Sequence, residues 1–171
     1  WIPLLLPKEQ FRMELRTFSS AFPHVEIFFA DPGSVMMLGA PSPIVGRKRL
    51  SAERYWQLKT GRDLADIRIP SEAVLLSHWV ASGPDLREVV GDGPINTWDH
   101  PLLEFAVYRS PAAEMVLESA ENLELLVAAQ ELGLKRGRSP FLQPDSPVFR
   151  TTALLRRARM ALLRDQIAEA D

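Results

Sequence analysis

The sequence predicts an α/β fold in which the edge of a β-sheet is followed by a mostly helical part. Two observations carry this prediction. The spacing of four, three and four residues between apolar side chains is the period of a helix buried on one face, and it connects Phe11, Leu15, Phe18 and Phe22. Two apolar segments then flank the turn residues 31–34, a pattern typical of an antiparallel hairpin. At 171 residues, 46% hydrophobic and 25% charged, the chain can bury one core or two small ones.

The first segment, residues 1–7, is apolar but lacks a basic leader. It is far shorter than the roughly 20 apolar residues that cross a bilayer, so we interpret it as the end of a strand. Because the chain begins on Trp1 inside an apolar run, we expect it to be part of a longer protein. Pro7 suits the first turn of the helix predicted over residues 8–22, and Pro23 ends that helix.

The two strands predicted over residues 25–30 and 35–40 are apolar at nearly every position. Both of their faces should therefore be covered, as in the strands of a sandwiched α/β sheet. A single helix covers only one face, and two strands alone do not make a stable sheet. We therefore expect this hairpin to be the edge of a larger sheet.

Residues 46–110 are predicted to form a helical extension that returns to the sheet by a short strand. Ser71 supplies an N-cap and Glu72 a first-turn acid for a helix that runs through Val80. Residues 83–85 are expected to break that helix. Further short helices are expected at 51–59, 63–67 and 86–90, the last of them closed by Gly91 and Gly93.

Residues 111–171 are predicted to form a pair of helices. The first, 111–134, is rich in Ala, Glu and Leu and is ended by Gly133 and Gly137; a proline-rich loop, 139–147, leads to a helix over 148–170. Basic residues in this part could bind an anionic partner, but complementary faces of the two helices are the simpler interpretation. The bases are Lys135, Arg136, Arg138, Arg150, Arg156, Arg157, Arg159 and Arg164, and the acids are Glu114, Glu118, Glu121, Glu124 and Glu131.

The composition excludes several classes of function. A net charge of −2 argues against a nucleic-acid binder, because neutralising phosphates requires a surplus of Lys and Arg. Without cysteine there is no disulfide, no thiolate nucleophile and no Cys-based zinc site. The three histidines are far apart in sequence, so no metal site is predicted. A cytoplasmic setting fits this composition.

The run from Asn96 to Phe105 is the first place to look for a site. It sets polar groups, among them Asp99 and His100, beside an apolar stretch that carries the single carboxylate of Glu104. Ordinary packing does not call for this mixture. We expect the run to enter as a loop and to leave as a strand over residues 102–107.

Several motifs resemble bacterial spermidine-synthase-like proteins, the polyamine aminopropyltransferase family. In order they are Trp1-Ile-Pro-Leu-Leu, the Leu-Arg-Thr-Phe of residues 15–18, the Phe-Pro-His-Val of residues 22–25, and a hairpin ending Met37-Leu38-Gly39. The run at 96–105 resembles the family's Asn-Thr-Asp-Asp-x-Pro-x-x-Glu-Phe/Tyr segment, with Trp98 in place of its first Asp. The resemblance covers roughly residues 1 to 109.

The resemblance implies the Rossmann-like fold of S-adenosylmethionine-dependent methyltransferases, with residues 1–45 as the end of that domain. It also implies a transferase of polyamine biosynthesis, which moves an aminopropyl group from decarboxylated S-adenosylmethionine, its co-substrate, to an amine. In such folds the nucleoside lies over a Gly-rich turn after the first strand. The chain's one Gly-x-Gly, at 91–93, is followed by proline, and the family's catalytic Asp segment is not recognisable. We therefore assign no catalytic residue and expect no cofactor binding or catalysis by this chain alone.

Four residues are the candidate substrate ligands under this resemblance: Trp1, Asp99, His100 and Glu104. The carboxylates could hold a cationic polyamine, but each residue also has a structural interpretation. Asp99 could brace its own turn through backbone N–H groups, and Glu104 could pair with an arginine or face solvent. His100 could be a core histidine bonded to a carbonyl, and Trp1 could serve packing alone.

Two functions from different classes follow. The chain is either the C-terminal part of a spermidine-synthase-like transferase or a helical protein-interaction module attached to a degenerate transferase remnant. In the first case its partners are the upstream transferase segment of the same protein, a polyamine substrate and a second copy in a homodimer. Attachment to a membrane would come only through a segment outside this chain.

Overall fold

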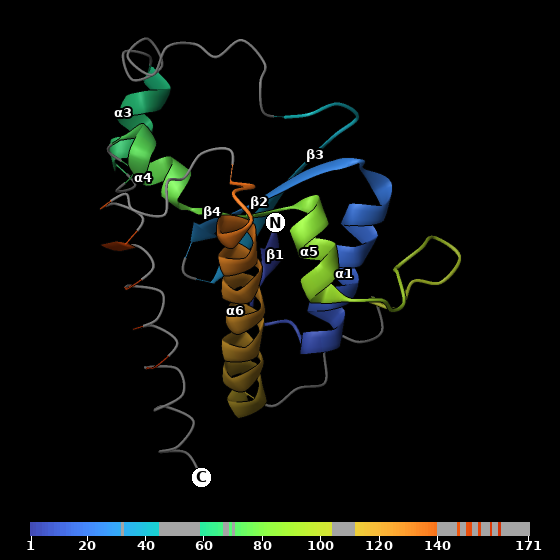
Figure 1. Cartoon of the computed structure of the whole chain (residues 1–171). Helices are drawn as coiled ribbons and strands as arrows, with labels where there is room; N and C mark the ends of the chain where they lie inside the picture. The colour runs from blue at the N-terminus through green and yellow to red at the C-terminus, as the bar shows by residue number, and fades with distance from the viewer. Residues whose placement is uncertain are drawn as a thin grey trace.

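The computed structural model describes residues 1–31, 33–44, 59–66, 69, 71–103 and 112–139, and single positions between 147 and 161. These residues form a mixed α/β arrangement in which one four-stranded antiparallel sheet carries three helices, α1, α5 and α6, on one face (Figure 1). The elements are β1 (Ile2–Pro3), α1 (Lys8–Ala21), β2 (His24–Asp31), β3 (Ser34–Ala40), α3 (Lys59–Asp66), α4 (Glu72–Ser77), β4 (Trp79–Ser82), α5 (Gly83–Val90) and α6 (Ala112–Lys135).

The strands lie in the order β1-β3-β2-β4. The predicted hairpin is confirmed: β2 and β3 are antiparallel, with Ile27 opposite Met37 and Phe29 opposite Val35. β1 pairs with the other edge of β3, also antiparallel. β1 and β2 therefore run in the same direction on either side of β3, and α1 connects them.

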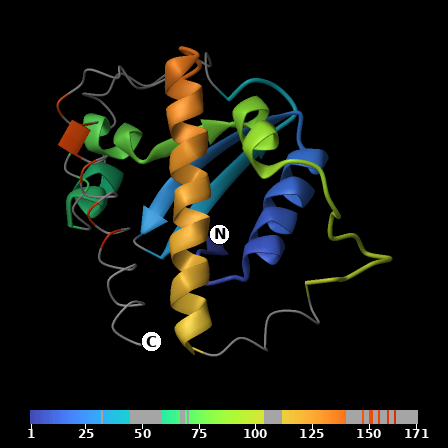
Figure 2. The same cartoon turned by 60° about the horizontal axis from the view of Figure 1, so that its bottom comes forward.

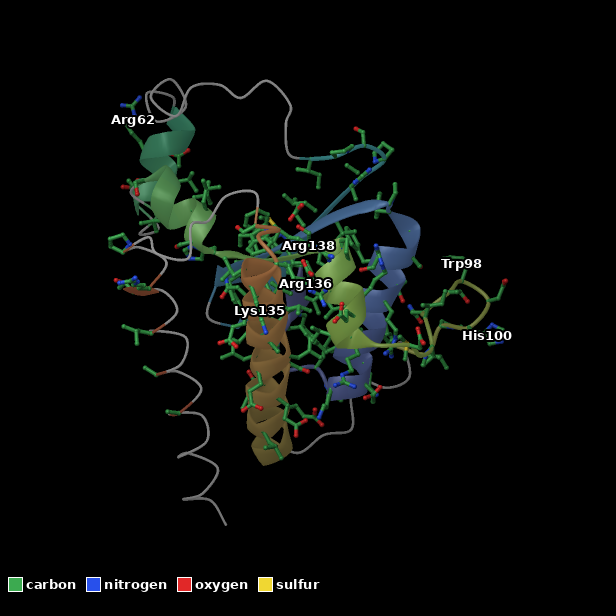
Figure 3. All side chains as sticks on the ribbon, viewed as in Figure 1. Arg62, Trp98, His100, Lys135, Arg136 and Arg138 are labelled. Atoms are coloured by element: carbon green, nitrogen blue, oxygen red, sulfur yellow. The ribbon has the colours of Figure 1, made fainter. Side chains whose placement is uncertain are left out.

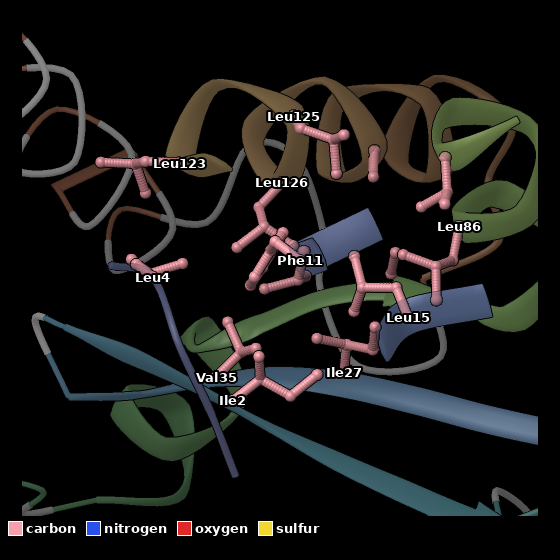
Figure 4. Packing of buried hydrophobic residues seen from close by; sticks show 14 of the residues in the cluster. Ile2, Leu4, Phe11, Leu15, Ile27, Val35, Leu86, Leu123, Leu125 and Leu126 are labelled. Carbon is pink, nitrogen blue, oxygen red and sulfur yellow. The ribbon is translucent and has the colours of Figure 1, made fainter. Parts of the chain in front are cut away.

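The core lies between the sheet and these three helices (Figure 4). The stripe predicted for the first helix is confirmed, since Phe11 and Leu15 are fully buried and Phe18 and Phe22 pack against the same cluster. β-Strand side chains that point toward the helices complete this core, because alternate residues of a strand share one face. They include Ile2, Val25, Ile27, Phe29, Val35 and Ala81.

α6 crosses the helical face of the sheet and holds the N-terminal segment in place (Figure 2). Asn122 Nδ2 donates to the carbonyl oxygens of Leu4 at 2.9 Å and Leu6 at 2.6 Å. Lys8 contributes both its backbone N–H, bonded to Glu118 Oε2, and its ammonium, 3.1 Å from Glu121 Oε2. Two acids of the predicted helix pair thus bind the start of α1.

The helix predicted from Ser71 through Val80 ends earlier. Its cap is confirmed, because the Ser71 side chain accepts a hydrogen bond from the Val74 N–H at 3.3 Å. The helix stops at Ser77, and the next residues form β4 against β2. Trp79, at the start of β4, is fully buried, as are the two residues that follow it. Burial in the sheet therefore outweighs helix continuation at this point.

Two predicted breaks also differ. Residues 83–85 begin α5 instead of separating helices, because Ser82 is the N-cap and Pro84 lies in the first turn, where its missing N–H has no partner to lose. Gly133 lies inside α6, which ends at Lys135; Gly137, with φ of 63°, follows in the left-handed region that favours glycine. α3 starts at Lys59, earlier than predicted.

Several predictions fall outside the described residues. These are the helix at 51–59 except its last residue, most of the strand predicted at 102–107, and nearly all of the loop and helix that follow residue 139. Leu102 and Leu103 themselves lie in a turn. Within the described part of the chain, no helix has both the length and the hydropathy needed to cross a membrane.

Candidate functional site

The predicted site residues Asp99 and His100 lie on an exposed loop after α5. Thr97 and His100 exchange both backbone hydrogen bonds, at 3.3 and 3.0 Å, so Trp98 and Asp99 form the tip of a tight turn. Trp98 is 98% exposed, and Figure 3 shows it with His100 on the loop that projects past α1. Asp99 and His100 are adjacent here, but described side chains do not enclose them.

Trp1, which precedes β1, is 77% exposed. In Figures 1 and 2 the N-terminus lies beside the sheet, away from the tip of the loop. Glu104 lies outside the described residues. Amine binding by these four residues stays a prediction.

The loop is fastened to α1 by residues of the Leu-Arg-Thr-Phe segment. Arg16 Nε donates to the Pro94 carbonyl at 3.0 Å, and the Asn96 N–H donates to Thr17 Oγ1 at 2.7 Å. The Asn96 side chain in turn accepts from the Leu103 N–H at 3.3 Å. Two motifs that carry the family resemblance are therefore in contact, and Asn96 shapes the loop.

A cleft of about 240 Å³ opens where the start of β2 meets the end of β4 and the first turn of α5. Its walls are largely apolar, formed by Val25, Ile44 and three prolines. Its polar lining comes from His24, Glu26 and Ser82. The cleft therefore combines the buried carboxylate of Glu26 with apolar walls.

Glu26 is positioned by the pairing of two strands that are far apart in sequence. In β2 it stands opposite Ser82 of β4, and it is only 8% exposed. Trp79 Nε1 donates to its Oε2 at 2.7 Å, and Ser82 Oγ lies 3.0 and 3.1 Å from its two oxygens. Both described donors are neutral, so the carboxylate is oriented without being neutralised.

Burial is the main reason that the pKa of Glu26 is raised above its usual value. The hydrogen bonds from Trp79 and Ser82 act in the opposite direction, because they stabilise the ionised form. The nearby charge of Asp85 raises the pKa further, and His24 lowers it. A carboxyl group with a raised pKa in a cleft is a candidate for cation binding or proton transfer.

Asp85, in the first turn of α5, is a second buried carboxylate, but it has cationic partners. Its Oδ1 lies 2.9 Å from Arg138 Nη1 and 3.4 Å from Arg136 Nη1. Arg136 also makes two hydrogen bonds to Glu88, at 2.6 and 2.9 Å, which hold the pKa of Glu88 below its usual value. We call these four residues the arginine cluster. Its ion pairs fasten the end of α6 to α5, and Figure 3 labels Arg136 and Arg138 near these two helices.

The arginine cluster changes the interpretation of the predicted basic surface. Arg136 and Arg138, just after the end of α6, contact acids of α5. The predicted pairing of the helices at 111–134 and 148–170 lies largely outside the described residues. A second cleft, of about 230 Å³, lies between α1, α5 and residues 91–95 and includes Arg16 and Arg87. Arg16 there already donates to the carbonyl of Pro94 in the loop and to that of Val90 at the end of α5. Among the residues that the structure describes, no three metal-ligating side chains gather into a site.

The sequence analysis missed Glu26. The signal was present, because a lone carboxylate in an apolar strand is the same criterion that singled out Glu104. No family model, curated protein or solved structure matches the chain.

Proposed function

We propose that this chain forms the sheet-edge and helical part of a Rossmann-like transferase of the spermidine-synthase-like kind. The observation that supports this is the path β1–α1–β2. Two strands that run in the same direction and are joined by a helix form the building unit of Rossmann-like sheets. The antiparallel β3 then lies between them as the last strand of a closing hairpin.

The free edge of β1 supports the same proposal. β1 pairs with β3 through one edge, and no strand of the described region pairs with its other edge. Further strands of an upstream transferase segment would extend the sheet there. That segment would carry the Gly-rich turn for the nucleoside, which this sequence lacks.

In the proposed reaction, an amine nitrogen attacks the methylene next to the sulfonium of decarboxylated S-adenosylmethionine. A C–N bond forms, the C–S bond breaks, methylthioadenosine leaves, and the nitrogen releases a proton. Upstream residues would bind the nucleoside, and this chain would hold the cationic end of the amine with carboxylates. The chain would therefore not be catalytic by itself.

Calorimetry on the complete protein that contains this chain tests the proposal. Heat of binding is expected with methylthioadenosine and with spermidine. If neither ligand gives heat, the transferase proposal is wrong.

The second candidate is the interaction module, and Trp98 is the observation in its favour. A tryptophan exposed at 98% on a loop that is hydrogen-bonded to α1 resembles the aromatic anchors of protein interfaces. In this case the complete protein would give no heat with either ligand. Binding of methylthioadenosine would instead contradict the hypothesis that the transferase part is a degenerate, non-catalytic remnant.

A further inference from the structure

We propose that the cleft at Glu26 binds the primary ammonium group of a small aliphatic amine, with Glu26 as its counter-ion. The identification of that amine as a transferase substrate rests on the proposed function. The ammonium site itself is inferred from the chain's own geometry.

The first argument is the number of hydrogen bonds that Glu26 can still accept. An ionised carboxylate has about four acceptor positions. Trp79 and Ser82 each have one hydrogen to donate, so the described donors fill two of these positions. An ammonium group has three N–H donors, and it can supply both the missing hydrogen bonds and the missing charge.

The second argument is charge. Buried carboxylates are normally paired with a cation. The described lining of the cleft includes no lysine or arginine, and His24 is the one other titratable side chain in it. Asp85 adds a second negative charge nearby, although its own arginines compensate it. Among the described residues, a cation entering the cleft would therefore meet a carboxylate that no lysine or arginine of the cleft lining compensates.

The third argument is the shape of the cleft and the nature of its walls. At about 240 Å³ it is smaller than the roughly 300–1,000 Å³ of clefts that enclose drug-sized ligands. Val25, Ile44 and the prolines offer apolar contact for a short alkyl chain. One carboxylate among apolar walls matches an alkylammonium ion better than a nucleoside or an acidic ligand.

Ionisation of Glu26 is supported by its position. The N-terminal end of α5, at Gly83 and Pro84, borders the same cleft. The positive end of a helix dipole stabilises a nearby anion. The groups that face the carboxyl group are then the two neutral donors, the helix end, His24 and Asp85.

The test is calorimetric titration of the full chain with 1,4-diaminobutane at about pH 8, where alkyl amines are still charged. 1,4-Butanediol, with the same length and no charge, serves as the control ligand. We expect the diamine to bind and the diol not to bind. Absence of diamine binding at millimolar concentration would overturn the proposal.

Glu26→Gln is the decisive variant, because glutamine removes the charge and keeps one oxygen that can accept from Trp79, while an NH2 donor replaces the second oxygen. Diamine affinity is expected to fall about tenfold or more. Asp66→Asn, which neutralises an exposed carboxylate at the end of α3, is the matched control and should leave affinity unchanged. Circular dichroism melts establish that both variants fold. Equal diamine affinity in Glu26→Gln and wild type would overturn the site, as would loss of binding in Asp66→Asn alone.

A transfer assay on the complete protein separates this inference from the proposed function. If diamine binding depends on Glu26 but no methylthioadenosine is released, the proposed transferase is wrong and the ammonium site stands. If Glu26→Gln transfers the aminopropyl group as well as wild type, the transferase stands, and the amine bound at Glu26 is not its substrate.

Discussion

Two buried carboxylates, Glu26 in β2 and Asp85 in the first turn of α5, have different partners. Asp85 is fully buried and is held by the guanidinium groups of Arg136 and Arg138. Glu26, at 8% exposure, is held among described residues by an indole N–H and a hydroxyl. Two arginines compensate the charge of the first carboxylate, whereas the described donors to the second are neutral groups. Asp85 therefore fastens α5 to the end of α6, and Glu26 is the carboxylate that we propose binds a ligand.

The cost of burying a charge explains why the difference between the partners of Asp85 and Glu26 is informative. Removing a carboxylate from water costs several kcal/mol, and a nearby cation offsets that cost at Asp85. A neutral hydrogen bond contributes only about 1 kcal/mol, so two of them leave part of the cost at Glu26 uncompensated. The raised pKa of Glu26 is the direct consequence.

The largest effect is expected from removing the cations of the arginine cluster. Arg136→Gln combined with Arg138→Gln leaves Asp85 buried without a cationic partner among the described residues. We expect the free energy of unfolding to fall by about 3 kcal/mol, measured by urea denaturation.

Lys135→Gln, on the same turn and exposed, is the control for loss of positive charge, and its effect should stay within about 0.5 kcal/mol. If the double variant is no less stable than Lys135→Gln, Asp85 does not depend on its arginines.

A smaller loss of stability is expected from Gly133→Ala, because the added methyl group would crowd both Trp79, a donor to Glu26, and Asp85. A Cβ there would lie 2.9 Å from Trp79 Cη2 and 3.2 Å from Asp85 Oδ2. Alanine improves helix propensity by about 1 kcal/mol, but the crowding against an aromatic ring costs more, and a net loss of about 1–2 kcal/mol is expected.

NMR distinguishes this crowding from a backbone effect. In Gly133→Ala the indole N–H resonance of Trp79 should shift, because the ring that donates to Glu26 is displaced. Gly137→Ala, at φ of 63° with open space around it, should lose about 1 kcal/mol without moving that resonance. Equal spectra for the two variants would contradict the close approach.

Ser82→Ala sharpens the comparison at Glu26 itself. Removing the hydroxyl leaves Trp79 as the one described donor to the carboxylate, so the ionised form is less stabilised and the pKa rises further. Stability at neutral pH should fall by about 1 kcal/mol. In a pH series of diamine titrations, the midpoint of binding should move to higher pH. An unchanged midpoint would show that Ser82 does not stabilise the charge.

The sequence alone predicts the helix at 8–22 and the hairpin well, because each has a local signal. The buried stripe of α1 repeats over four positions, and the hairpin has turn residues between two apolar strands. β4 carries no such signal. Trp79, Val80 and Ala81 continue the apolar character of α4, and a strand buried on both faces shows no alternation. Only pairing with β2 decides its structure.

The candidate cleft is unpredictable for the same reason. Glu26 receives its hydrogen bonds from residues 53 and 56 positions away, and those residues belong to the strand that the sequence does not reveal. Asp99 and His100 are visible as a motif, but burial depends on tertiary contacts, and the structure exposes both.

The smallest effect on stability is expected from Glu26→Gln. Asp85→Asn, measured beside it, shows how the two buried carboxylates differ. Asp85→Asn should lose about 2 kcal/mol at neutral pH; the value is moderate because Arg136 and Arg138 are 35% and 45% exposed, and water partly replaces the lost carboxylate. Glu26→Gln should be as stable as wild type or up to about 1 kcal/mol more stable, because the variant buries no charge.

The direction of the pKa shift at Glu26 determines how its contribution to stability changes with pH. The folded-state pKa of Glu26 is raised, so the folded protein holds this proton more tightly than the unfolded chain. The corresponding stability is present below the unfolded pKa and is lost as pH rises through the folded pKa. Glu26→Gln has no carboxyl group at this position, so its stability does not fall for this reason. In urea denaturation, its free energy of unfolding should therefore rise relative to that of wild type as the pH increases from about 4 to about 8. Removing a buried charge lowers stability only where the fold itself compensates that charge. If Glu26→Gln instead loses as much stability as Asp85→Asn at neutral pH, Glu26 is therefore a structural carboxylate like Asp85.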